Sequence, residues 1–203
     1  MAKIKLSKNE LKRQKEALER FNHYLPMLVL KKQQLQFELS KIDHAICQTQ
    51  EKIETREGMV SAWVSVFGEE VGLSQLLVPE HIKVETGNVA GIDIPLFREV
   101  EFKEQEYDLL LTPLWVDKAI EVCKELISLR AQILIYQQQR DILSEELRIT
   151  TQRVNLFEKV KIPQARENIR IINVYLGDLQ TAEVVRGKIA KAKIEQKRGA
   201  VAI

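Results

Sequence analysis

The sequence predicts a mainly α-helical fold: a long antiparallel two-helix coiled coil with a small head insert that contains a β-hairpin. Two segments with helical apolar periodicity, residues 1–68 and 113–203, predict the coiled coil. Between them, residues 69–112 combine glycines with β-branched and aromatic runs and predict the insert. The composition agrees, because 203 residues include only 8 Gly and 5 Pro, while 30% are charged and 6% aromatic.

The first helix is predicted from a heptad pattern that follows a capping box. Ser7 is the expected N-cap, and Glu10, three residues later, completes the box. Counted from Leu11, eleven of fifteen a and d positions are apolar, which is typical of a coiled coil. We expect bends near Pro26 and Gly58, and a break in the helix at residues 68–72.

The insert is expected to hold one β-hairpin at about residues 81–102. HIKVET (81–86) and IDIPLFREVEF (92–102) have strand composition, and we expect Gly87 and Gly91 to supply the turn conformations between them. Because exposed loops carry contacts more often than stability, residues 87–97 are predicted to be dispensable for folding of the coiled coil and important for function.

The second helix is expected to start at Pro113, with Thr112 as its N-cap. Beyond Pro163 its apolar stripe resumes one position later, so the helix keeps its period but shifts its face. Pro163 either introduces a bend that the function needs or is a tolerated structural kink. In both cases Pro163→Ala should stabilise the helix. Polar Arg140 and Thr150 interrupt the predicted seam, which consists of Leu126, Leu129, Ile133, Tyr136, Leu143, Leu147, Val154 and Phe157.

Two long helices joined through a small head should pair antiparallel within one chain. At 1.5 Å per residue they would form a rod of roughly 80–120 Å, with both termini at one end and the head at the other. Cysteines placed near residues 11 and 190 are therefore expected to cross-link within one chain.

The motif search predicts no enzyme, cofactor or metal site. Gly187-Lys188 lacks the upstream glycine of a phosphate-binding loop, and the three histidines show no metal-ligand spacing. Cys47 and Cys123 are interpreted as reduced thiols of a cytoplasmic protein. No signal peptide or apolar membrane span is predicted.

Charge is distributed unevenly although the formal net charge is only +2. Residues 1–20 carry seven basic against three acidic side chains, and residues 186–203 carry six against one. Residues 69–108 carry ten acidic against three basic side chains. The ends either meet different partners or are simply solubilised, and the lack of interleaved aromatics argues against nucleic acid.

Four stretches resemble one family, the D subunits of V-type and archaeal-type (V/A) ATPases and ATP synthases. They are NVAGIDIPLF (88–97), TPLWVDKAI (112–120), RVNLFEKVKIP (153–163) and the basic KIAKAKIEQKR (188–198). RVNxxEKxxIP is the most specific, and the order of the stretches covers nearly the whole chain. LPMLVLKKQQLQFEL (25–39) departs from the LLKxKxxxL of archaeal and eukaryotic members and is similar to the bacterial branch.

The resemblance implies a non-catalytic central-stalk rotor subunit, without cofactor or metal. Its partners would be the catalytic A and B subunits of the hexamer, the F subunit and the membrane-side adaptor subunit (C/d), at the cytoplasmic face of the inner (plasma) membrane. It would transmit torque that couples ATP hydrolysis or synthesis to proton or sodium transport. The alternative is a cytoplasmic coiled-coil scaffold or tether. Coupling candidates from the family motifs are Arg153, Val154, Asn155, Glu158, Ile162, Pro163, Asn88, Gly91 and Pro95.

Overall fold

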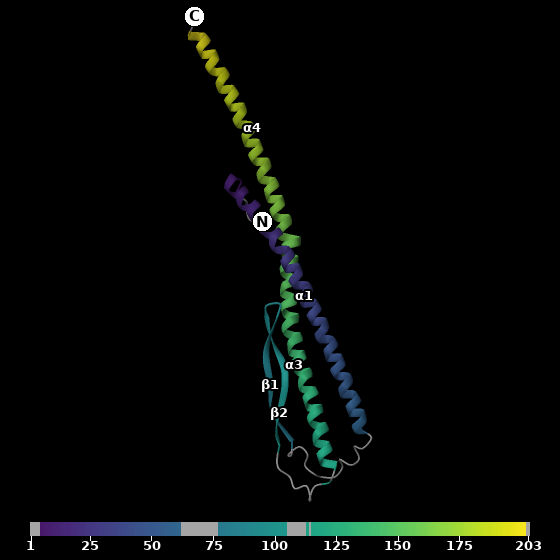
Figure 1. Cartoon of the computed structure of the whole chain (residues 1–203). Helices are drawn as coiled ribbons and strands as arrows, with labels where there is room; N and C mark the ends of the chain where they lie inside the picture. The colour runs from purple at the N-terminus through teal and green to yellow at the C-terminus, as the bar shows by residue number, and fades with distance from the viewer. Residues whose placement is uncertain (1–4, 62–76, 105–112, 114, 202–203) are drawn as a thin grey trace. The chain divides into compact units, whose positions relative to one another are not determined.

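A computed structural model describes residues 5–61, 77–104, 113 and 115–201. The predicted helix break at residues 68–72 and the predicted N-cap Thr112 lie outside these residues. Contacts divide the chain into two compact units, Met1–Leu30 with Thr151–Ile203 and Lys31–Thr150. The elements in chain order are α1 (Lys8–Ser61), β1 (Leu77–Val89), β2 (Ile92–Glu104), α3 (Trp115–Asn155), the π-helix η2 (Leu156–Lys161) and α4 (Ile162–Val201) (Figure 1).

Helix α1 starts where the capping box predicts. The backbone N–H of Glu10 donates to Ser7 Oγ at 3.3 Å, so the N-cap is confirmed. The Glu10 carboxylate instead accepts from the side-chain amide of Gln14 at 2.9 Å, one turn further on. The helix continues through Pro26 and Gly58 to Ser61. The predicted seam is confirmed from Leu11 to Ile53, because every one of these positions is half-buried or buried and all four buried residues of α1 are among them.

In the unit Lys31–Thr150, α1 and α3 pair antiparallel and the hairpin lies beside α3 (Figure 1). Ion pairs join the two helices from Lys31–Glu146, at 3.3 Å, to Arg56–Glu125, at 2.9 Å. The residue number of the α3 partner falls as the residue number in α1 rises, as it does when two helices pair antiparallel. The sequence therefore predicted the fold class correctly: paired long helices with a two-stranded antiparallel hairpin.

The predicted seam of α3 is wrong in its first half. Leu126, Leu129 and Ile133 are only half-buried, whereas Ala131, Ile135 and Gln139 are buried at 5%, 7% and 3% exposure. The reason is that α3 packs against the hairpin as well as α1, so its buried face is wider than a two-helix seam. From Leu143 onward the seam holds, and Thr150, predicted as an interruption, is itself buried at 1% exposure.

In the unit Met1–Leu30 with Thr151–Ile203, the start of α1 pairs with η2 and the first half of α4. The rings of Phe21 and Phe157 lie 5.1 Å apart, and the side-chain amide of Asn168 donates to Gln14 Oε1 at 3.3 Å. Ile172, fully buried, is the last buried residue of α4 among those whose side chains the structure describes. Beyond it α4 continues past the start of α1 (Figure 1).

This offset corrects the predicted cross-link between residues 11 and 190. Gln14 contacts Asn168, and residue 190 lies 22 positions beyond Asn168, which is roughly 33 Å along a helix.

We expect Gln14→Cys with Asn168→Cys to cross-link within one chain through a short bismaleimide, because the two side chains already touch. The pair Gln14→Cys with Ala190→Cys serves as the control and should not react. Denaturing electrophoresis after treatment of dilute protein reads out both pairs. A reaction of the control pair, or a product between chains only, would contradict the offset.

Candidate functional site

The RVNLFEKVKIP motif spans the end of α3, all of η2 and the start of α4. The structure divides its six candidate residues between two roles. Val154 and Ile162 are buried, at 5% and 7% exposure, and belong to the seam. The other four are exposed, and they are Arg153, Asn155, Glu158 and Pro163.

The π-helix is the feature of this motif that the sequence prediction missed. The backbone N–H of Ile162 donates to the carbonyl of Phe157, five residues earlier, instead of four as in an α-helix. Pro163 follows directly and has no N–H to donate. The predicted shift of the apolar stripe at this point is therefore real, and its structural form is a π-turn. Whether Pro163 also bends the helix stays a hypothesis.

The hairpin tip holds the other three candidates, Asn88, Gly91 and Pro95. The two loop residues, Ala90 and Gly91, have φ of 52° and 80°, as a type I′ turn requires. The Asn88 side chain locks this turn: its oxygen accepts from the Gly91 N–H at 3.1 Å and its amide donates to Asp93 at 2.7 Å.

Gly87 does not supply a turn conformation, contrary to the prediction. It lies inside β1 opposite Ile94, and among the described glycines only Gly91 has a positive φ. A Cβ at Gly87 would come within 2.7 Å of the exposed Leu96 side chain, so a larger residue there would require Leu96 to shift.

The tip packs onto the helices rather than projecting as a free loop. Ile94 is 4% exposed and forms a core with Leu35 and Ile42 of α1 and Leu143 of α3. The carbonyl of Pro95 accepts a hydrogen bond from the buried side-chain amide of Gln139. This packing argues against the prediction that residues 87–97 are dispensable for folding of the coiled coil, because Ile94 is part of this core.

The sequence analysis missed Gln139 as a residue that positions the tip. A polar residue at four-residue spacing with Ile135 and Leu143 was the available signal, since a buried polar side chain must find a partner.

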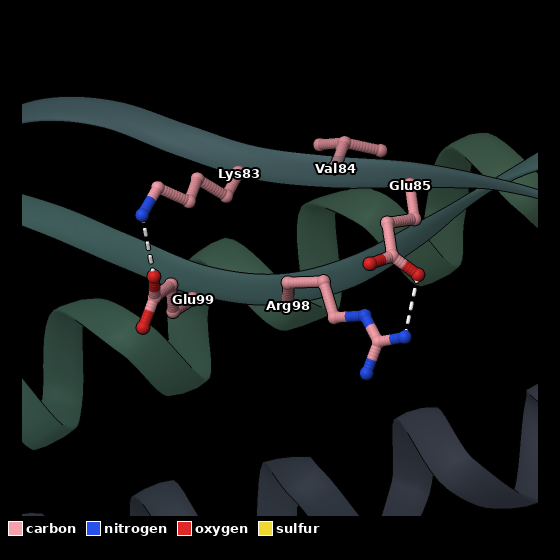
Figure 2. A pocket seen from close by; sticks show the side chains of 5 residues that line it. All are labelled: Lys83, Val84, Glu85, Arg98 and Glu99. Atoms are coloured by element: carbon pink, nitrogen blue, oxygen red, sulfur yellow. Dashed lines mark hydrogen bonds and ion pairs between the residues drawn. The ribbon is translucent and has the colours of Figure 1, made fainter.

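Paired charges cover the open side of the hairpin (Figure 2). Lys83 Nζ lies 2.7 Å from carboxylate oxygens of both Glu99 and Glu101, and Arg98 lies 2.5 Å from Glu85. The hydrogen bond from Lys83 lowers the pKa of Glu99, and the two glutamates raise the pKa of Lys83. The recess in Figure 2 is thus walled by charges that already neutralise one another in pairs.

The two groups of candidates do not form one site within either compact unit. The candidates of the helical motif belong to the unit with Thr151–Ile203, whereas Asn88, Gly91 and Pro95 belong to Lys31–Thr150. Within the described residues, no helix has the length and apolarity that crossing a membrane requires. Across the same residues, no cluster of His, Cys, Asp and Glu is arranged to hold a metal ion.

Paired long helices with a two-stranded antiparallel hairpin define the class of helical coiled-coil proteins. The sequence profile of the ATP synthase D subunit matches residues 10–192. The chain belongs to this family. It is 47% identical over 198 residues to the D subunit of a V-type ATP synthase from Borreliella burgdorferi, covering 97% of this chain and 98% of that one.

Other relatives agree. The D subunit of the V-type ATP synthase of Chlamydia caviae is 30% identical over 97% of this chain and 96% of its own length. That of Chlamydia muridarum is 32% identical over 96% and 98%. The resemblance noted in the sequence motifs, including the bacterial assignment, is therefore confirmed, and the chain is a subunit of a V-type ATP synthase.

Proposed function

We propose that this chain is the central-stalk rotor subunit of a V/A-type ATPase or ATP synthase. It transmits torque between the catalytic A/B hexamer and the membrane rotor ring, and so couples ATP hydrolysis or synthesis to proton or sodium transport. Its partners are the A and B subunits, the F subunit and the membrane-side adaptor subunit (C/d). The complex holds it at the cytoplasmic face of the inner (plasma) membrane, and the ATP chemistry belongs to the hexamer.

The observation that carries this proposal is the unpaired second half of α4. From residue 173 to 195 every described side chain is exposed except Leu176 and Ala182, which are half-buried. Large apolar side chains nevertheless recur there, among them Val174, Val185 and Ile189, at 54%, 49% and 51% exposure. Apolar side chains that remain exposed along a long helix favour a surface that another chain covers.

Charge supports the same assignment. Arg186, Lys188, Lys191 and Lys193 are exposed on this part of α4, so the apolar side chains stand among basic ones. The hairpin, by contrast, carries six acidic against three basic side chains in residues 77–104, so a net negative charge remains after its ion pairs. Surfaces of opposite charge on one subunit suit two different partners, as a shaft between a catalytic head and a membrane rotor would require.

The test is co-purification from the native organism through an affinity tag on the catalytic A subunit. We expect this chain in the complex at one copy per A/B hexamer, since a central shaft has room for one. Quantitative mass spectrometry of the purified complex gives the ratio. Recovery at one copy per A/B pair, or absence from a complex that is otherwise intact, would contradict a central stalk.

A further inference from the structure

The spacing of the α1 seam is regular. The predicted seam positions follow one another at intervals of three and four residues from Leu11 to Ile53, and each of them is half-buried or buried. Such a strict seven-residue repeat matches a partner helix with the same repeat. The α1 seam positions are Leu11, Gln14, Leu18, Phe21, Leu25, Leu28, Lys32, Leu35, Leu39, Ile42, Ile46, Thr49 and Ile53.

The partner seam has one interval of five residues. The seam runs through Leu143, Leu147, Thr150, Val154 and, inside η2, Phe157, and after η2 it runs through Ile162, Ala165, Ile169, Ile172 and Leu176. Every interval is three or four except that from Phe157 to Ile162. This helix therefore has one residue more than the repeat can accommodate. The π-turn closes its hydrogen bond between these same two residues, so it absorbs the extra residue.

The side chains on either side fix where this extra residue can be absorbed. If the π-turn moved one heptad towards the N-terminus, Asn155 and Glu158 would replace Val154 and Phe157 in the seam. If it moved towards the C-terminus, Lys161, Gln164 and Asn168 would replace Ile162, Ala165 and Ile169. Either change would put polar side chains where apolar ones are buried, which is unfavourable.

We propose that η2 is a fixed phase step in the helix pair, forced by one extra residue and not by Pro163. The step interrupts the seven-residue repeat of this helix by one residue. It also sets which face of α4 stays open. A regular repeat continued from Phe157 would turn Ile171 and Tyr175 toward α1, whereas both are exposed, at 38% and 39%.

Pro163 has a secondary role in this account. A proline cannot donate the backbone hydrogen bond that a regular turn at its position needs. Placed directly after the π-turn, it disfavours an uninterrupted α-helix there and helps to hold the step in place. Replacing it alone leaves the interval of five residues, so the step should persist.

The test compares four variants of the full-length subunit by thermal unfolding and amide hydrogen exchange. Deletion of exposed Lys159 restores an interval of four, so it should keep the melting temperature within about 3 °C of the parent, or raise it. The amides of residues 160–162 should then exchange more slowly. Lys159→Ala is the matched control, removing the side chain but keeping the residue, and should leave exchange unchanged.

Deletion of His23 is the second control, because this exposed residue lies in the regular part of the α1 seam. It should lower the melting temperature by about 10 °C or more, since it displaces the half-buried seam positions before it. Pro163→Ala should keep the exchange pattern of the π-turn. The proposal is overturned if deletion of Lys159 destabilises as much as deletion of His23. It is also overturned if Pro163→Ala alone, or Lys159→Ala alone, gives slow exchange at residues 160–162.

Discussion

Replacing Ile94 with alanine should lower the free energy of unfolding by about 2–4 kcal/mol, as large-to-small changes in a packed core do. Ile94 is 4% exposed and inserts between Leu35, Ile42 and Leu143, so its loss leaves a cavity at the junction of hairpin and helices. Urea unfolding of the purified subunit, followed by circular dichroism, measures the change.

Ile82→Ala is the matched control for this prediction, because it is the same substitution on the same hairpin. Ile82 is 41% exposed, and its truncation should cost less than about 1 kcal/mol. Equal effects of the two substitutions would mean that the hairpin does not pack on the helices as described. Small effects of both substitutions would support the prediction that the hairpin tip is dispensable for folding.

Truncation of the chain after Gly177 should abolish coupled ion transport while leaving the subunit folded. The removed residues contain no buried side chain among those described, so the melting temperature should stay within about 2 °C of the parent. If α4 is the part of the shaft held by the hexamer, its loss removes the surface through which torque passes. ATP hydrolysis and ion uptake in reconstituted vesicles give the two readouts.

A full-length variant with Val174, Val185 and Ile189 changed to serine tests whether the apolar surface of α4, and not only its length, is required. It keeps the helix and its charges but removes exposed apolar side chains. We expect ion transport to fall at least tenfold, because contacts between α4 and its partner would be weakened. Normal coupling by the truncated chain would contradict the proposal that the second half of α4 is a partner surface of the shaft. A large drop in its melting temperature would instead show that the extension stabilises the fold.

The regular parts of this fold could be predicted from the sequence. The α1 seam follows from a repeat that a single partner helix satisfies, and the hairpin follows from β-branched runs on either side of Gly91. Both depend on neighbours in sequence or on one simple periodicity. The family motifs likewise identified the chain as a D subunit.

The parts that failed depend on contacts between three elements. The α3 residues before Leu143 face α1 and the hairpin together, so a two-helix pattern chose Leu129 and Ile133 over the buried Ile135 and Gln139. The stripe shift near Pro163 was visible, but it was interpreted as the effect of a proline. Counting the seam intervals on both helices distinguishes an inserted residue from a bend, and that count needs the burial of Phe157 and Ile162.

The candidate coupling residues taken from the family motifs include both buried and exposed positions. Val154 and Ile162 occur in a family motif but are buried seam residues, whereas Gln139 anchors the tip and belongs to none of the motifs quoted. A motif shows which residues recur, but it does not distinguish residues that pack inside the subunit from residues that contact partners. Exposure does, and it leaves Arg153, Asn155, Glu158 and Pro163 as the candidates in the helical motif that a partner can reach.

Direct observation of rotation tests the central proposal. In a background with Cys47→Ser and Cys123→Ala, exposed His81 on the hairpin is replaced by cysteine and labelled with a bead, while the A/B hexamer is fixed to a surface. A rotor subunit predicts that ATP drives the bead in one direction, and that the rotation stops when ATP is removed. A bead that stays still while the same immobilised complexes hydrolyse ATP and retain the labelled subunit would contradict it.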